Sequence, residues 1–441
     1  MDPWHIVRIT MRLYSSYSRR KEDLALPPGP IGMYVCGPTV YQRIHIGNAR
    51  PFIFSMWLRR WLELSGYQAR LVLNVTDIND RIYDAARAQG ISSAELARQA
   101  AQWYFEDTSA LGLGRPDVEP LATETVPEIV ALIGELIARG LAYESAGDVY
   151  FGVARFPDYG LLSGARPEDM VAQEPGPRKE DPRDFALWKA NKADEDTWWP
   201  SPWGPGRPGW HIECSAMAEK HLGPRFEVHG GGLDLRFPHH ENEVAQSRGA
   251  GRDFARLWIH NGMLELRAEK MSKSVGNVVS LRASLDSWGR EPILVFFLNA
   301  HYRSPVEYSD AAMEAARAQV ADFRAAARVA EQRPCAFAWD SFRAALDDDF
   351  DTPRALSILH AWRAAGQVEL LGRGLRVFGL AIDADGTEAP PEVHRIAEAR
   401  QAARQRRDFR DADRLRSEID RLGWDVQDGS GGAFRLVRKR R

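Results

Sequence analysis

GMYVCGPTVYQRIHIGN, at residues 32–48, is a short apolar run followed by a Gly-Pro loop and the start of an amphipathic segment. Residues 33–36 have the character of a buried strand. Residues 46–65 show the apolar spacing of a helix, and Gly66 is a typical helix end. Residues 69–75 form a continuous apolar run, as expected of a parallel strand buried on both faces. This order predicts a right-handed βαβ unit and therefore an α/β fold.

The length and composition are those of a multidomain globular enzyme. The chain has 441 residues, 44% of them hydrophobic and 27% charged, which suggests roughly two to four domains. No apolar run approaches the length of a transmembrane helix, and the amino terminus lacks an apolar signal core. We therefore expect a cytoplasmic protein with no membrane partner.

The cysteines argue against a disulfide framework. The three of them, Cys36, Cys214 and Cys335, are too few and too scattered for one. A cysteine with a function is therefore expected to bind a metal or to act as a thiol. Cys335 falls outside every motif described below and is predicted to be structural.

The charge is unevenly distributed along the chain. The formal net charge is -3, yet residues 396–441 contain 13 Lys and Arg against 8 Asp and Glu. A basic terminal module on an acidic body is typical of a surface for a polyanion. A solvated helical face explains the same charges equally well.

The remaining chain can be divided by its periodicity. Helices are predicted from Ser92, with Glu95 completing a capping box, and over residues 126–139. Residues 145–210 combine many Trp, Pro and Gly with weak periodicity, which predicts an inserted, loop-rich segment. A second set of α/β elements follows, to about residue 300.

Beyond residue 309 the pattern is helical. Thr352 and Pro353 are predicted to be the N-cap and first residue of a helix, and a Pro-containing break at residues 388–391 precedes the basic module. We therefore expect an α/β domain in two halves, 1–125 and 210–308, separated by an inserted connective segment, 126–209, and followed by a helical bundle, 309–388, and a small basic module, 389–441.

The densest polar cluster is EVHGGGLDLRFPHHENEVAQS, residues 227–247. Pro238 suits a helix start, and on a helix His239 and Glu243 share one face. Together with Cys36 and Cys214 they would make a tetrahedral set of two sulfurs, one nitrogen and one oxygen, which suits zinc. No CxxC pair supports this, and both cysteines could be small buried hydrophobic residues. Other candidate ligands are His211, His221, His229 and His240.

Two segments are suited to phosphate. EKMSKSVGN, residues 269–277, places Lys270 and Lys273 three apart among serines, although exposed Lys-Ser loops are common. HIGN, residues 45–48, lies at the amino end of a predicted helix, where free N–H groups and the helix dipole favour anions. Neither a P-loop nor a GxGxxG fingerprint is present, so a nucleotide would have to bind by another scheme.

In this order, the segments resemble the cysteinyl-tRNA synthetases, a family of class I aminoacyl-tRNA synthetases. HIGN is similar to the HIGH signature of that class, and residues 270–274 match its KMSKS signature letter for letter. The resemblance extends from about residue 10 to the end of the chain. It implies a Rossmann-like, parallel-sheet catalytic domain with an insertion, a helical bundle and a small anticodon-binding module. Further blocks similar to the family are MYVCGPTVY, NVTDIND, GWHIECSAM and FPHHENE.

The resemblance implies one zinc ion held by Cys36, Cys214, His239 and Glu243, with the sulfur of the substrate cysteine as a further ligand. An apolar pocket separates cysteine from serine poorly, by roughly 10- to 200-fold. Zinc favours a thiolate over a neutral hydroxyl. Discrimination of about 10,000-fold needs roughly 5.5 kcal/mol, which is a plausible demand on a metal–sulfur bond, so an editing domain would be unnecessary.

The reaction implied has two steps. Cysteine and ATP, accompanied by Mg2+, give cysteinyl-adenylate and pyrophosphate, and tRNA(Cys) then takes the cysteinyl group. Positioning and charge stabilisation dominate such chemistry. Asn48 stands where the HIGH signature has a second histidine, and it cannot be cationic. The implied catalytic residues are His45, Asn48, Lys270 and Lys273, and Gly47 and Ser272 join them in binding ATP.

Around the substrate cysteine, the resemblance implies a pocket made by Thr39, Thr76, Trp210, His229 and Asp234, although Trp210 could be an ordinary core aromatic. The family implies a monomer.

Two alternatives remain: a ligase that joins cysteine to an amino sugar in mycothiol synthesis, and a paralogue that only binds zinc or tRNA. For the basic module, the implied phosphate contacts to tRNA come from Arg404, Arg406, Arg407, Arg410 and Arg414.

Overall fold

The computed structural model describes residues 11–24, 26–165, 178–266, 269–270, 278–326, 333–381, 389–406, 408–428 and 434–438. Its centre is a four-stranded sheet in the order β10-β9-β3-β4, formed by Phe254–Asn261, Arg225–Gly232, Ile31–Val35 and Ala69–Leu73. All three pairings are parallel. Helix α1, Ile46–Leu64, connects β3 to β4, which confirms the predicted βαβ unit and the α/β class.

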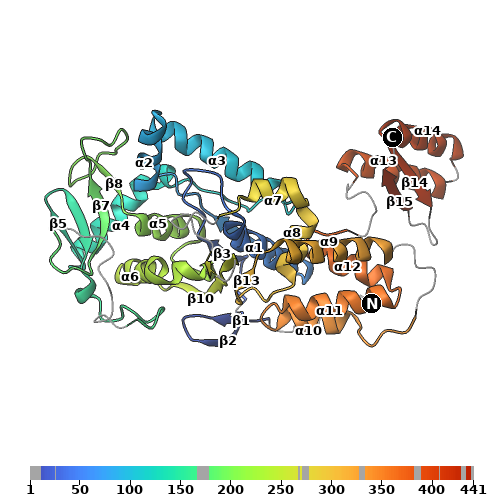
Figure 1. Ribbon diagram of the computed structural model, residues 1–441, viewed down its shortest axis with the longest axis horizontal. Helices are drawn as coiled ribbons and strands as arrows, with labels where there is room; N and C mark the ends of the chain where they lie inside the picture. Colours follow the sequence, from blue (N-terminus) through green and yellow to red (C-terminus); the bar gives the residue numbers. More distant parts are fainter. Residues whose placement is uncertain are drawn as a thin grey trace.

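Strand β3 is buried over its whole length because helices cover both faces of the sheet (Figure 1). Met33 and Val35 face a core that includes α1 and the helices after residue 280. Tyr34 and Cys36 face the opposite core, which includes α4, Val126–Ala138, and α5, Trp210–Leu222. The two-residue period of the strand therefore decides that Cys36 points toward α5.

The inserted segment is more regular than its sequence predicts. It contains a four-stranded antiparallel sheet in the order β5-β6-β7-β8, built from Ala142–Ser145, Asp148–Phe151, Phe185–Ala190 and Gly206–Pro208. Each strand has three to six residues, too few for a clear alternation of apolar and polar residues. The expectation of a loop-rich segment was therefore wrong for these strands.

The other elements of the catalytic half surround the central sheet. The carboxyl-terminal side of the sheet is flanked by α2, Asp80–Gln89, and α3, Ser93–Ser109, whose N-cap Ser92 accepts from the Glu95 N–H as predicted. The remaining elements are β1 (Arg12–Ser15), β2 (Arg20–Asp23), the turns Leu233–Leu235 and Arg236–His240, α6 (Glu241–Gly249), β11 (Leu264–Leu266), β12 (Glu269–Lys270), α7 (Leu281–Trp288), α8 (Arg290–Leu298) and β13 (Val306–Glu307).

The helical pattern predicted beyond residue 309 is present as α9 (Asp310–Ala325), α10 (Trp339–Asp347), α11 (Thr352–Ala364) and α12 (Val368–Val377). The start of α11 differs by one residue from the prediction. Asp351 is the N-cap and accepts from the Arg354 N–H. The Thr352 hydroxyl instead donates to the Ala300 carbonyl, 3.0 Å away, so it ties α11 to the end of α8.

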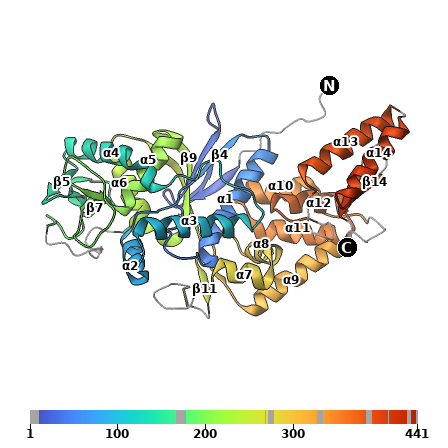
Figure 2. The same ribbon diagram turned by 90° about the horizontal axis from the view of Figure 1, so that it is seen from above.

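The last elements are α13 (Pro391–Gln405), α14 (Phe409–Arg421), β14 (Trp424–Asp428) and β15 (Phe434–Arg438). They share a small core of their own around Val393, Ile419 and Trp424. Both views place this module and the inserted sheet at opposite ends of the molecule (Figures 1 and 2). Among the helices of the described ranges, none is long and apolar enough to cross a membrane.

Candidate functional site

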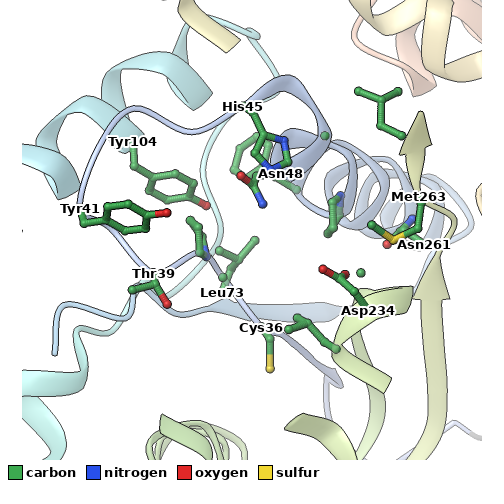
Figure 3. Close-up of a pocket in the computed structure, with 18 of the residues that line it drawn as sticks. Cys36, Thr39, Tyr41, His45, Asn48, Leu73, Tyr104, Asp234, Asn261 and Met263 are labelled. Atoms are coloured by element: carbon green, nitrogen blue, oxygen red, sulfur yellow. The ribbon is translucent and has the colours of Figure 1, made fainter. Parts of the chain in front are cut away.

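A cavity of about 840 Å³ opens at the carboxyl ends of the central strands. Cys36 at the end of β3, the first turn of α1, and the segment after β10 all contribute to its lining. Figure 3 shows Cys36 at the floor, with its sulfur pointing away from His45 and Asn48. Ligands of parallel α/β proteins bind at this edge of the sheet.

A glycine allows β3 and β4 to approach each other at the cavity floor. The Gly37 N–H donates to Asn74 Oδ1 at 2.9 Å. A Cβ at this position would lie 1.7 Å from the Asn74 carbonyl oxygen, so only glycine fits without movement of the backbone. Cys36 is thereby held against the sheet, one residue before the chain turns into the loop toward α1.

The amino end of α1 forms the cavity wall above this floor. His45 is its N-cap, in extended conformation and without a side-chain cap. His45, Gly47 and Asn48 all line the cavity, and the first turn contains no acidic residue. A Cβ on Gly47 would lie 2.9 Å from His45 Nδ1, so the glycine leaves room for the imidazole. The Ile46 N–H donates to the Val279 carbonyl and the Asn48 N–H to the His45 carbonyl. The suitability of this wall for phosphate therefore comes from the helix dipole and from the side chains of His45 and Asn48.

Beneath the floor, Cys36, Cys214, His239 and Glu243 come together, and their ligand atoms all lie within 4.8 Å of one another. All four side chains are buried. Glu243 Oε1 lies 3.3 Å from Cys36 Sγ and 3.1 Å from His239 Nε2. The four residues come from the position after β3, from α5, from the turn before α6 and from α6, so the fold brings all four predicted ligands together. His239 and Glu243 do share a face, as their spacing indicates.

Buried histidines surround this cluster. His229 Nε2 lies 2.8 Å from Glu243 Oε2, and His211 Nδ1 lies 2.8 Å from His239 Nδ1. These contacts orient the carboxylate and the imidazole so that Oε1 and Nε2 face the sulfurs. Burial lowers the pKa of His211 to about 3, so its ring is neutral near pH 7. His221 lies outside the clusters found among the described residues.

A second chain of hydrogen bonds reaches the cluster from the amino-terminal hairpin. His260 Nε2 lies 2.8 Å from His240 Nδ1, and His260 Nδ1 lies 2.8 Å from Ser16 Oγ. Burial lowers the pKa of His260 to about 3. His260 is not in any of the sequence motifs described above, although its position near the carboxyl end of an apolar run, residues 254–261, was a usable signal.

The donor set fits a zinc ion. Two thiols, one imidazole nitrogen and one carboxylate oxygen are ligands that zinc takes in tetrahedral sites. Burial raises the pKa of the Cys36 thiol well above its usual value, and that of Cys214 is raised as well; a cation is what would favour their thiolates here. Cys36, His229, His240 and Glu243 form a second close set, with one sulfur fewer.

The predicted residues of the amino acid pocket are divided between the cavity and its support. Thr39, Trp210 and Asp234 line the cavity, and the Trp210 ring stacks on His239 with centroids 4.4 Å apart. Thr76 and His229 do not line it. Thr76 is buried and lies beside Thr39 in an isolated β-bridge. His229 instead contacts the Glu243 carboxylate.

The predicted lysines are only partly described. Lys270 ends β12, whose partner β11 begins at Leu264 in the cavity lining. Ser272 and Lys273 lie outside the described residues. Cavity residues that the sequence motifs did not predict include Tyr41, Tyr104, Asn261 and Met263. Asn261 was detectable in principle, since it ends a parallel strand.

Residues 24–318 match the family model described as the tRNA synthetases class I (C) catalytic domain, and residues 387–434 match the cysteinyl-tRNA ligase anticodon binding domain. The curated cysteine–tRNA ligase of Cupriavidus taiwanensis is 42% identical, over 96% of this chain and 98% of that protein. The chain belongs to the cysteine–tRNA ligase family. The family member from Rubrobacter xylanophilus is 45% identical, over 92% of this chain and 95% of that protein.

Solved structures of other aminoacyl-tRNA synthetases are similar in fold to this member of the cysteine–tRNA ligase family. Mycobacterium tuberculosis methionyl-tRNA synthetase, in complex with methionyl-adenylate, superposes with a TM-score of 0.59 at 18% identity. The match covers 80% of this chain and 90% of that one. A leucyl-tRNA synthetase of Agrobacterium radiobacter K84 has a TM-score of 0.55 at 11% identity, over 80% of this chain and 83% of that one. The class I synthetase fold is therefore shared across these enzymes.

Proposed function

We propose that the protein activates L-cysteine with ATP and transfers the cysteinyl group to the 3′ end of tRNA(Cys). Family membership supports this assignment. The observation that carries it is a buried cluster of two sulfurs, an imidazole and a carboxylate directly beneath a cavity whose wall is a helix amino terminus. This arrangement can hold a thiol substrate and a phosphate side by side.

Selection of cysteine over serine is assigned to the cluster. Cys36, Cys214, His239 and Glu243 would hold one zinc ion, with His211 and His229 fixing the orientation of His239 and Glu243. When bound there, zinc supplies a coordination position that takes a thiolate in preference to a neutral hydroxyl. Trp210, stacked on His239, would exclude water from the substrate side chain. Thr39 and Asp234, which line the cavity, would hold its ammonium and carboxylate groups.

Binding of ATP is assigned to the wall made by α1. His45, Gly47, Asn48 and Ser272 would bind ATP, which Mg2+ accompanies. Lys270 and Lys273 would neutralise the departing pyrophosphate. In the first step a carboxylate oxygen of cysteine bonds to the α-phosphorus and the bond to pyrophosphate breaks. In the second step a terminal ribose hydroxyl bonds to the carbonyl carbon, AMP leaves, and the hydroxyl proton is released. Asn48 contributes hydrogen bonds to these phosphates but no charge.

Recognition of the tRNA anticodon is assigned to the carboxyl-terminal module, residues 389–441. Of the rest of the chain, we assign residues 1–125 and 210–308 to the catalytic domain, 126–209 to the connective insertion and 309–388 to the helical bundle. In the last module Arg414 already pairs with Asp411 and Glu418, whereas Arg406 and Arg410 are exposed. Arg404 is half-buried on α13, and Arg407 lies outside the described residues.

The experiment that tests this function is transfer of labelled cysteine, with ATP, to either unfractionated tRNA or glucosaminyl-inositol. Pyrophosphate exchange alone is insufficient, because an amino sugar ligase also forms the adenylate. We expect label in tRNA that is removed by ribonuclease and is abolished by Lys273→Ala. Label in the amino sugar would instead assign the protein to thiol biosynthesis, and label in neither would leave a binding-only protein.

A further inference from the structure

Tyr34 lies two residues before Cys36 on the same face of β3, and the proposed zinc site gives it no role. The side chain is 0% exposed. Its ring packs against Phe226 and His229, with centroids 6.5 and 5.2 Å away. Its hydroxyl has no hydrogen-bond partner, whereas a buried tyrosine hydroxyl normally has one. A phenylalanine would pack in the same way without the cost of a buried, unpaired hydroxyl.

The hydroxyl of Tyr34 faces the cluster of candidate zinc ligands. Side chains of a strand stand roughly perpendicular to the sheet, and Tyr34 and Cys214 share the core between β3 and α5. Burial raises the pKa of the Tyr34 hydroxyl well above its ordinary value. Cys214, Cys36 and Glu243 raise the same pKa further, so the hydroxyl lies close to these three groups.

The hydrogen-bond contacts of the two sulfurs are with acceptor oxygens. Cys36 Sγ lies 3.3 Å from Glu243 Oε1. Cys214 Sγ lies 3.8 Å from Asn74 Oδ1. The Asn74 amide is held in this orientation because Oδ1 also accepts from the Gly37 N–H at 2.9 Å. These oxygens accept from a thiol, but neither can donate to a thiolate.

Thiolates at this place need donors because the site is buried and rich in negative charge. Two thiolates and the Glu243 carboxylate carry more negative charge than one zinc ion neutralises, and the thiolate of the substrate would add to it. A buried charge is costly unless hydrogen bonds satisfy it. Hydrogen bonds to the ligands of a metal also tune how strongly the metal binds a further ligand. The phenol hydroxyl of Tyr34 is a donor of this kind.

We propose that the Tyr34 hydroxyl donates a hydrogen bond to the Cys214 sulfur when the cluster holds its metal ion, which makes Tyr34 a positioning residue for the selection of cysteine. The inference rests on the proposed function and adds a residue to its selectivity site. The hydrogen bond withdraws electron density from the Cys214 sulfur, so the metal binds the sulfur of the substrate more strongly. Tyr34 is outside the cavity lining and acts through the cluster.

The test uses the absorption spectrum of bound cobalt(II), which reports directly on the sulfurs. The full-length protein is loaded with cobalt in place of zinc, and the thiolate-to-cobalt charge-transfer band is compared between wild type and Tyr34→Phe. Loss of the hydrogen bond raises the energy of the sulfur lone pairs, so the band should move to longer wavelength. Zinc affinity, measured by competition with a chelator, should fall by about 10- to 100-fold.

Selection between amino acids gives a second readout. In Tyr34→Phe the preference for cysteine over serine in adenylate formation should fall by about 10-fold, near the lower end of the effect of a hydrogen bond to a charged group. The loss should appear in KM for cysteine. KM for ATP should stay within twofold of wild type, because the wall made by α1 does not depend on the Cys214 sulfur.

The matched control is Tyr104→Phe. Tyr104, on α3, is 1% exposed and its hydroxyl also has no partner, but it belongs to the other core of the sheet, away from Cys214. Its cobalt spectrum and zinc affinity should equal those of wild type. Both variants keep the aromatic ring and remove a hydroxyl without a partner, so both should fold, and thermal unfolding checks this.

A charge-transfer band and a zinc affinity that are unchanged in Tyr34→Phe would overturn the proposal. An equal shift of the band in Tyr104→Phe would overturn it as well. A wild type that binds the metal but charges no tRNA would refute the proposed function, while the spectra would still decide the role of Tyr34. A wild type that binds neither zinc nor cobalt would overturn both.

Discussion

Cys214 lies fully buried on α5, among the ligand atoms of the cluster. We expect Cys214→Ser to reduce zinc content well below one ion per chain, because a neutral hydroxyl is a poor zinc ligand. Discrimination against serine in adenylate formation should fall by at least about 10-fold. Metal analysis and exchange assays with each amino acid measure both effects.

Cys335 supplies the matched control for that variant. It is half-buried beside the helical core and far in sequence from every ligand. Cys335→Ser should keep both the metal and the selectivity. Full zinc content together with rejection of serine in Cys214→Ser would show that the ligand set is wrong.

Arg50, on α1, is a second residue whose buried side chain supports the cavity wall. It is 3% exposed and donates to the carbonyls of Gly262, His301 and Ser304 at 2.6 to 2.9 Å. Burial lowers the pKa of Arg50 to about 10, so it stays charged at pH 7. Because Gly262 lines the cavity, this guanidinium positions part of the cavity wall.

We expect Arg50→Met to destabilise the protein by about 3 kcal/mol, because buried carbonyls lose their donor. Urea denaturation measures this loss, and KM for ATP should rise in the same variant. Arg317→Met, which breaks an exposed pair with Glu314 and a cation–π contact with Trp288, should cost less than about 1 kcal/mol. Equal effects of the two substitutions would contradict the positioning role of Arg50.

Between elements, one carboxylate joins the inserted sheet to the catalytic half. Asp80 at the start of α2 pairs with Lys189 of β7 at 2.9 Å and with Arg207 of β8. Burial opposes ionisation of this carboxyl group, but Arg207 and the lysines outweigh it and lower its pKa to about 2. The pair therefore fixes where the insertion sits against α2.

The same contact gives a pH dependence of stability. The Asp80 pKa is lower in the native state than the unfolded value of about 4, so the stabilisation is complete above about pH 4 and is lost as the pH falls toward 2. Its full value would be about 2.5 kcal/mol, which we discount to about 1 because the side chain is 41% exposed. Urea denaturation of wild type and Asp80→Asn should differ by that amount at pH 7, and the difference should shrink below pH 4. A constant difference between pH 7 and pH 2.5 would contradict this account.

An element can be predicted from the sequence when its own residues show a clear pattern. It cannot be predicted in this way when it forms only by pairing with other strands. The helix α1 can be predicted because its apolar spacing extends over 19 residues, and β3 and β4 because each belongs to a continuous apolar run. The strands β5 to β8 cannot, since their order comes from pairing with one another. At the site, the spacing of His239 and Glu243 predicts a shared face. Tyr104 enters the cavity only through the packing of α3, which no local pattern encodes.

For the whole molecule, the separate core of the carboxyl-terminal module predicts separable functions. Removal of residues 389–441 should leave cysteine-dependent pyrophosphate exchange within about twofold of wild type. kcat/KM for tRNA should fall by about 100-fold, because several phosphate contacts are lost together. Both assays on the same preparation measure the difference. A parallel loss of exchange would show that the module supports the catalytic half.

The order of the central sheet also constrains how the protein is made. Strand β3 ends at Val35, but its neighbour β9 begins at Arg225, so one edge of β3 stays unpaired while the ribosome adds the residues between them. At roughly 5–20 residues per second, that interval is on the order of 10 to 40 seconds. During this time the Cys36 thiol has neither Cys214 nor Glu243 beside it. The nascent chain must therefore keep one reduced sulfur and one open strand edge protected until its second half emerges, and metal loading follows translation of residue 243.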